Sequence, residues 1–268
     1  MPHLRTVRLP SPTRKQVSAF PFNLPLLRSS DEISFDQPVT FLVGENGSGK
    51  STLMEALAIG IGARTIGSSS VDRDPTLNAV RPLGRALRLV WNKRTKAGFF
   101  LRAEDFFGFV KRLQQTRADL TREMREVQEE LKDSSAYARG LATSPFAREL
   151  SDLKRRYGDG LDTMSHGESF LRLFQERFTP GGLYLLDEPE TPLSPLRQLA
   201  LLSQIKEMVA QDCQFIIATH SPILMAYPDA KILSIEEGAI RHVAYDDLEH
   251  VRLTRDFLNN PEQFLRYL

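Results

Sequence analysis

The 268-residue sequence has little cysteine and no long hydrophobic run. Its single cysteine, Cys213, cannot form an intrachain disulfide, which excludes a disulfide-stapled scaffold and fits a reducing compartment. No apolar run approaches the roughly 20 residues of a membrane-spanning helix, and the first residues lack the apolar core of a signal peptide. We therefore expect a soluble, cytoplasmic protein without membrane insertion.

The sequence also lacks an excess of charge of one sign. Its 35 Lys and Arg residues against 34 Asp and Glu residues leave a net charge of +1, so the whole chain is not committed to a nucleic acid or an anionic membrane. Such a partner would have to bind a local patch. A composition of 41% hydrophobic and 26% charged residues excludes a disordered chain and favours one well-packed body.

Apolar strands alternate with helical patterns along most of the chain, which predicts an α/β fold with a mostly parallel sheet flanked by helices. We expect strands at residues 38–43, 183–186, 215–218 and 231–234, and helices at residues 51–61, 169–178 and 195–210.

The remaining segments are harder to assign from sequence. Residues 62–84 are expected to form a long loop, and residues 86–91 and 98–102 to form a β-hairpin. Residues 106–133 predict one long helix with a narrow apolar seam, followed by further helix to about residue 157. An intermolecular coiled coil and a helix lying on its own domain both fit the seam. We favour the second because the heptad pattern is short.

A phosphate-binding loop is the most specific motif. The run Gly44-Glu-Asn-Gly-Ser-Gly-Lys-Ser51 matches G-x-x-x-x-G-K-[ST] between an apolar strand and a helix. Its glycines let the backbone wrap around a phosphate, Lys50 is expected to reach the β- and γ-phosphates, and the Ser51 hydroxyl to bind Mg²⁺. The predicted ATP-binding residues here are Gly44, Glu45, Asn46, Gly47, Ser48, Gly49, Lys50, Ser51 and Thr52.

Two later strands end in polar residues that suit the same site. Asp187 and Glu188 follow one apolar strand, and His220 follows the next. Because parallel strands end at one edge of a sheet, we expect these side chains to meet the phosphates. Asp187 would complete the Mg²⁺ shell, Glu188 would accept a proton from the attacking water, and His220 would contact the γ-phosphate or that water.

The run Met164-Ser-His-Gly-Glu168 before the next helix decides the class. With these motifs in this order, the chain resembles an ATP-binding-cassette ATPase, and a soluble SMC/RecF-like member of the AAA-family ATPases in particular. The resemblance implies a single P-loop NTPase domain over residues 1–268. Its α/β core, with an antiparallel β part, would comprise residues 1–104 and 179–268, and its helical lobe residues 105–178.

In that family the serine-and-glycine signature binds the γ-phosphate of ATP held by a second subunit, so the resemblance implies an ATP-dependent head-to-tail homodimer. Ser165, His166, Gly167 and Glu168 align with the family's Ser-Gly-Gly-Gln. His166 adds bulk and Glu168 adds an anion near phosphate. Without the resemblance, the same run is an ordinary capped helix start.

Two further positions follow from the resemblance. Glu104 matches the glutamine that senses Mg²⁺ and is predicted as a metal ligand, although a simple surface acid fits as well. Ser194 stands where the family places an aspartate that communicates across the dimer, with Pro192 before it, which brings coupling between the two sites into question.

These features predict an ATP-hydrolysing dimerisation switch acting in DNA repair or another DNA-associated process. An ATP-sensing module with little turnover and the ATPase subunit of a membrane transporter are the alternatives. Residues 1–30 and 75–103 are rich in Lys and Arg and resemble a footprint for nucleic acid, although solvated surface charge explains them equally well.

Overall fold

The structure is a computed structural model that describes residues 1–66, 70–157 and 166–266. A six-stranded sheet lies at its centre, in the order β5-β6-β7-β3-β8-β9. The first five strands run parallel and β9 is antiparallel to β8. The strands are β3 (Val39–Val43), β5 (Phe100–Arg102), β6 (Leu183–Asp187), β7 (Gln214–Ala218), β8 (Lys231–Glu236) and β9 (Ala239–His242).

The apolar runs of the sequence are explained by burial on both faces of this sheet. Every residue of β3, β6 and β7 is buried, so these strands show no polar alternation. The predicted α/β fold with a mostly parallel sheet is therefore confirmed.

A second, antiparallel sheet has the order β2-β1-β4, formed by β2 (Glu32–Ser34), β1 (Leu4–Arg8) and β4 (Arg88–Trp91). The predicted hairpin of residues 86–91 and 98–102 is wrong, because β4 pairs with β1 whereas β5 pairs with β6 in the central sheet. The physical reason is burial: all three residues of β5 are buried, whereas β4 alternates exposed and half-buried residues.

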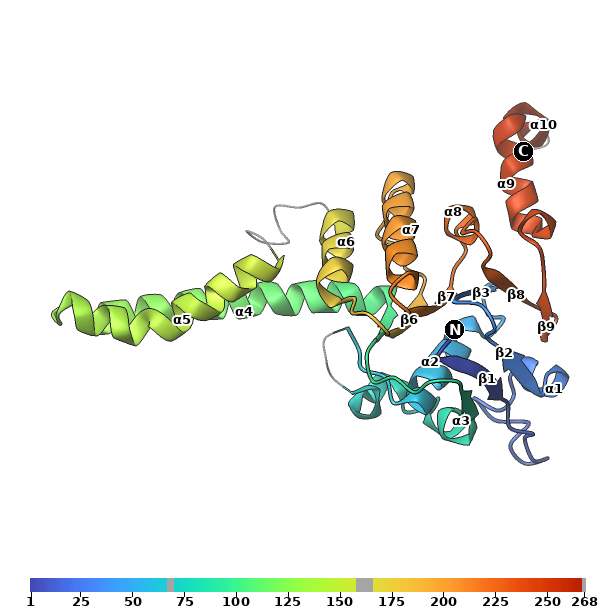
Figure 1. Cartoon of the computed structure of the whole chain (residues 1–268), viewed down its shortest axis with the longest axis horizontal. Coiled ribbons are helices and arrows are strands. Elements are labelled where there is room, and N and C mark those ends of the chain that lie inside the picture. The colour runs from blue at the N-terminus through green and yellow to red at the C-terminus, as the bar shows by residue number, and fades with distance from the viewer. Residues whose placement is uncertain (67–69, 158–165, 267–268) are drawn as a thin grey trace.

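Helices cover both faces of the central sheet (Figure 1). One apolar core joins α2 (Lys50–Ile61), α1 (Leu26–Ser29) and α3 (Arg81–Ala86) to the antiparallel sheet and to one face of the central sheet. The expected loop over residues 62–84 is wrong in part. It contains two 3₁₀ turns, η1 (Val71–Arg73) and η2 (Pro75–Leu77), and the start of α3, since Leu77, Val80 and Leu83 are buried in this core.

The opposite face is covered by α6 (His166–Arg177), α7 (Pro195–Val209) and α8 (Pro222–Met225). Phe99, Phe174, Phe178 and Tyr184 pack against one another between α6 and the sheet, with ring centroids 4.7–6.1 Å apart. The phenylalanine pairs are stacked, and Tyr184 meets Phe99 and Phe178 edge-on. Beyond β9, η3 (Tyr245–Asp247), α9 (Glu249–Asn259) and α10 (Pro261–Leu265) extend away from the sheet (Figure 1).

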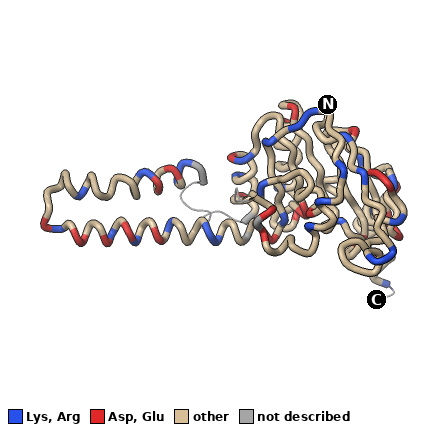
Figure 2. Tube along the Cα trace, turned by 90° about the horizontal axis from the view of Figure 1, so that it is seen from below, with Lys and Arg blue, Asp and Glu red and all other residues tan. Residues whose placement is uncertain are grey.

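The long helix is confirmed as α4 (Ala103–Glu130), but it does not lie on its own domain as expected. It pairs with α5 (Ala136–Tyr157) in an antiparallel helical arm that projects from the body (Figures 1 and 2). Leu120 is buried on the seam, and the charges of both signs around the arm keep its remaining surface in water. No helix in the described part of the chain is long and apolar enough to span a membrane.

Candidate functional site

The loop between β3 and α2 has a backbone that requires glycine. Gly44, Gly47 and Gly49 have φ angles of 148°, 82° and 98°, in the region that other residues rarely adopt. A Cβ atom on Gly44 would lie 2.5 Å from the carbonyl oxygen of Ile235. The loop can therefore wrap closely around a small anion, and α2 begins directly behind it.

Lys50 places its ammonium group inside this loop. Its side chain is buried, and Nζ donates to the carbonyl oxygens of Gly44 at 2.7 Å and Glu45 at 2.9 Å. Burial lowers the pKa of Lys50, while Glu188, Asp187 and Glu190 favour its charged form. The loop thus holds a cation that is complementary to a phosphate.

Asp187 is the last residue of β6 and is buried beside the start of α2. It accepts a hydrogen bond from Ser51, which with Lys50 favours its charged form, but burial dominates and raises the pKa of Asp187 to about 7. Its Oδ1 atom is buried and has no partner among the described residues. A carboxylate oxygen left free beside a hydroxyl is a donor set that suits Mg²⁺, so the residues present fit this ion.

Glu188 and His220 lie beside each other at the ends of β6 and β7. His220 Nε2 is 3.9 Å from Glu188 Oε1, and both side chains are about two-fifths exposed. With Glu45 and Asn46 they line an open hollow of about 590 Å³ next to the phosphate loop. Glu188 has a φ of 50°, an uncommon conformation that marks a constrained turn. An acid and a histidine therefore face the space where a terminal phosphate would lie.

Glu190 is a site residue that the sequence reasoning missed. Its Oε1 atom accepts a hydrogen bond from the backbone N–H of His220 at 2.7 Å, so it positions the turn that carries the histidine. The signal was present as a second acid after Glu188, but only the fold shows that it reaches the end of the neighbouring strand.

Glu104 makes a different contact from the one expected. Its side chain is 76% exposed and forms an ion pair with Arg102 at 3.5 Å. Buried Arg102, the partner of Asp187 in the β5–β6 register, occupies the strand end and also pairs with Glu55, Asp74 and Asp105. A metal-binding role of Glu104 stays a prediction.

Two family models match the chain in the segments that hold these residues. One, described as an AAA domain, matches residues 23–81, and the other, described as an AAA domain, putative AbiEii toxin, Type IV TA system, matches residues 169–226. The first segment contains the phosphate loop, and the second contains Asp187, Glu188 and His220. Both models describe AAA domains, and the chain has the α/β fold of a P-loop ATPase.

Solved structures similar to this chain include the Smc head domain of Pyrococcus furiosus bound to the C-terminal domain of ScpA. It is 14% identical, with 97% of this chain and 99% of that chain covered and a TM-score of 0.45. A nucleotide-free ATP-binding cassette from an ABC transporter is 17% identical, with 100% and 99% covered and a TM-score of 0.49. No curated protein matches the sequence.

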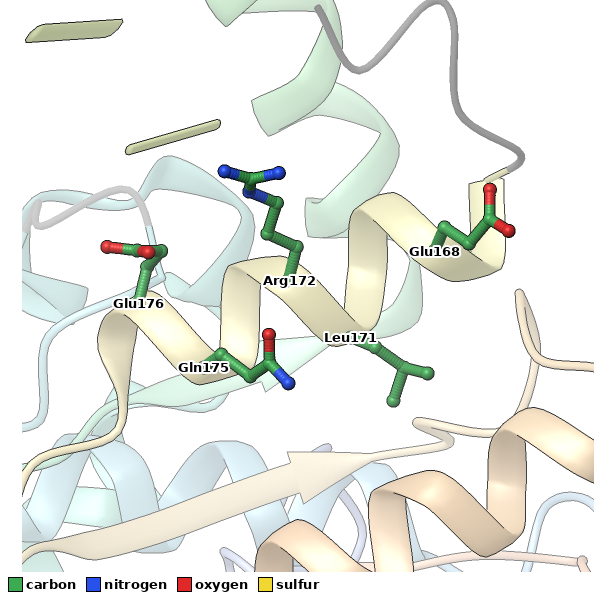
Figure 3. Close-up of a pocket in the computed structure, with 5 residues that line it drawn as sticks. All are labelled: Glu168, Leu171, Arg172, Gln175 and Glu176. Carbon is green, nitrogen blue, oxygen red and sulfur yellow. The ribbon is translucent and has the colours of Figure 1, made fainter. Parts of the chain in front are cut away.

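The predicted signature lies at the start of α6, apart from the phosphate loop. Ser165 lies outside the described residues, and α6 begins at His166. Gly167 is buried against the start of α7, and Glu168 forms an ion pair with Arg197 at 2.8 Å. Figure 3 shows Glu168, Leu171, Arg172, Gln175 and Glu176 along α6, where they line a hollow of about 330 Å³.

Proposed function

We propose that this ABC/SMC-like protein binds ATP with Mg²⁺ and hydrolyses it, and that ATP drives the head-to-tail association of two copies. The observation that carries the proposal is the convergence of Lys50, Asp187, Glu188 and His220 at the ends of the adjacent strands β3, β7 and β6. As part of this proposal the chain is one ATPase domain, with the α/β core at residues 1–104 and 179–268 and the helical lobe at residues 105–178.

Each residue has a role that its surroundings support. The loop N–H groups and Lys50 would hold the β- and γ-phosphates, and Ser51 and Asp187 would hold Mg²⁺. When bound, Mg²⁺ supplies charge that stabilises the phosphates during transfer. Glu188 would accept a proton from the water whose oxygen attacks the γ-phosphorus, while the bond to the bridging oxygen of ADP breaks. His220, 3.9 Å from Glu188, would hydrogen-bond the γ-phosphate.

Association of two copies would complete the site. The hollow beside Glu188 and His220 is open, and the Gly167 and Glu168 turn of the same chain contacts α7. A second copy would bring its own signature turn, Ser165 to Glu168, to the γ-phosphate. We also propose a cytoplasmic location for this switch, in line with a chain whose single cysteine, Cys213, forms no intrachain disulfide.

The Glu188→Gln variant tests the proposed cycle. The amide cannot accept the proton from water, so we expect turnover to fall by at least about 100-fold, while ATP and Mg²⁺ convert the monomer to a stable dimer. Phosphate release and sedimentation with and without ATP measure the two effects. Lys50→Ala in the same background is the matched control, and it should remove the dimer.

The alternatives give other results in the same assays. An ATP-sensing module with little turnover would show the ATP-dependent dimer already in the unaltered protein, with negligible phosphate release. A transporter subunit would co-purify with a membrane protein. An unaltered protein that hydrolyses ATP as a monomer at full rate would contradict the proposed dimer.

A nucleic acid is the partner that the charge distribution favours. The fold joins the two basic segments, because β1 and β4 pair and place Arg8 directly opposite Arg88. Both arginines are exposed, and like charges in opposed positions repel each other. Arg8 lies 3.8 Å from Glu32, an exposed pair that offsets this cost only weakly. A phosphate backbone bound across the two strands would offset it further, and solvated charge is the alternative.

A further inference from the structure

The first turn of α7 contacts both the signature turn and the turn that carries His220. Arg197 reaches back to α6, where its Nη2 atom lies 2.8 Å from Glu168 Oε1. Gln198 is the next residue, and its Oε1 atom accepts a hydrogen bond from the hydroxyl of Ser221, directly after His220. Two adjacent side chains of one helical turn therefore hold two segments that are far apart in sequence.

Gly167 of the signature turn is also packed tightly onto this helix. A Cβ atom on Gly167 would lie 2.6 Å from Arg197 Cδ and 3.0 Å from the carbonyl oxygen of Pro192, which belongs to the loop after Glu188. A larger residue at this position would force the Arg197 side chain or the Pro192 loop to shift. The position of the turn is thus set by Arg197 and by the same loop that follows the catalytic strand.

The ion pair between Arg197 and Glu168 also changes the charge that a phosphate of a second copy would meet. Glu168 is half exposed and would place a negative charge close to a γ-phosphate presented by a second copy, which opposes binding. The Arg197 guanidinium cancels that charge at hydrogen-bond distance. Because both side chains keep some contact with water, we expect a small effect on the stability of the fold. We expect a larger effect on the binding of an incoming phosphate than on folding. Loss of the Arg197 guanidinium changes the sign of the local charge that the phosphate meets.

We propose that Arg197 is a positioning residue of the two-subunit site. It neutralises Glu168, holds the Gly167 turn for the γ-phosphate of the partner, and together with Gln198 ties that turn to the His220 turn of its own subunit. This inference rests on the proposed function. Through α7, Arg197 and Gln198 would connect the signature turn of a subunit to the hydrolytic site of the same subunit. This connection begins next to Ser194, which stands where the family has an aspartate.

A double-mutant cycle in the Glu188→Gln background tests the charge role. Arg197→Gln removes the guanidinium that pairs with Glu168, so we expect ATP-dependent dimerisation to weaken roughly five- to tenfold. Arg197→Lys keeps the charge and should retain most of the affinity. The double variant Glu168→Gln and Arg197→Gln removes both charges and should return to within about twofold of Glu168→Gln alone. Sedimentation against protein concentration in ATP and Mg²⁺ measures the dimerisation constant of all five proteins, the Glu188→Gln parent included.

Turnover in the protein that retains Glu188 tests the connection to His220. ATP binding within one subunit does not use Arg197, so Arg197→Gln should lower kcat at fixed protein concentration and leave KM for ATP within about twofold. Arg155→Gln, which breaks an exposed ion pair with Asp152 on the arm, is the matched control and should change neither dimerisation nor kcat.

The outcomes separate the two proposals. If the Glu188→Gln protein dimerises with ATP but Arg197→Gln leaves dimerisation unchanged, or the double variant is as weak as Arg197→Gln, the inference is wrong and the proposed function stands. If the Glu188→Gln protein itself remains a monomer with ATP and Mg²⁺, the proposed function is wrong, and the role of Arg197 fails with it.

Discussion

At the scale of single residues, the buried carboxylate of Asp187 lowers the free energy of unfolding of the nucleotide-free protein when it is charged. Burial raises its pKa from near 3.8 to about 7, and its Oδ1 atom lacks a partner among the described residues. The folded chain therefore binds this proton more tightly than the unfolded chain. The resulting stabilisation is complete below about pH 4, is lost as the pH rises towards 7, and is absent above that value.

We predict that Asp187→Asn stabilises the nucleotide-free protein at pH 8 by about 2–4 kcal/mol, because an amide carries no charge to desolvate. The same variant should lose the stabilisation that ATP with Mg²⁺ gives to the unaltered protein. Urea unfolding at pH 5, 6, 7 and 8 measures the difference. A difference between the two proteins that stays constant with pH would contradict the assignment of this pKa to Asp187.

The site residues that the sequence predicted are those with a local signal. The spacing of Gly44 to Ser51, and acids or a histidine directly after apolar strands, identify Lys50, Asp187, Glu188 and His220 without knowledge of the fold. Arg102 and Arg197 have no such signal, because each acquires its role from partners that are remote in sequence.

At the scale of elements, Arg102 joins four segments of the core. It pairs with Glu55 of α2, Asp74 between the 3₁₀ turns, and Asp105 of α4, and its own strand is β5. Burial alone would lower the pKa of Arg102, but the hydrogen bonds that Arg102 donates to Asp105 and the charges of the surrounding acids outweigh it and raise the pKa. The guanidinium therefore remains charged and neutralises acids that are themselves largely buried.

We predict that Arg102→Met lowers the free energy of unfolding by about 3–5 kcal/mol, because it leaves these carboxylates without a cation. Arg122→Met is the matched control on α4. It removes exposed ion pairs with Asp119 and Glu126 and should cost less than about 1 kcal/mol. Urea unfolding at pH 7 compares the two, and equal losses would show that the Arg102 cluster does not hold the segments together.

The helical arm is an element whose stability is separate from that of the core. Between α4 and α5, Leu120 is buried at 9% exposure, and the described residues of the arm contact the body only near its base. We predict that Leu120→Ala opens the arm locally at a cost of about 2–4 kcal/mol, while the temperature of global unfolding changes little.

Limited proteolysis measures this opening through the rate of cleavage within residues 110–150. Leu141→Ala on α5 is the control, because Leu141 is 65% exposed and should leave that rate unchanged. A fall in global stability equal to the local loss would show instead that the arm and the core unfold together.

At the scale of the whole molecule, the antiparallel sheet collects positive charge that a linear count does not show. The net charge is +1, yet Arg8 and Arg88 are opposed on neighbouring strands. We predict that Arg8→Gln and Arg88→Gln each weaken binding of duplex DNA to the same degree for all sequences, and each reduce the slope of log affinity against log salt by about 1.

Fluorescence anisotropy with a labelled duplex at several salt concentrations measures both quantities. Arg155→Gln on the arm should leave the slope unchanged, since Arg155 lies outside the antiparallel sheet. Slopes that stay the same for all three variants would assign these arginines to solvated charge.

By itself, the sequence determined the parallel sheet, the phosphate loop and the order of the strand ends, because these depend on apolar periodicity and on motifs of a few adjacent residues. Only the tertiary structure decided that β4 and β5 belong to different sheets, and that the seam of α4 is covered by α5. It also decided that Arg197 pairs with Glu168. Each of these pairings joins segments that are far apart along the chain. Many other apolar or charged segments could form the same kind of contact, and only the packing of the whole core selects between them.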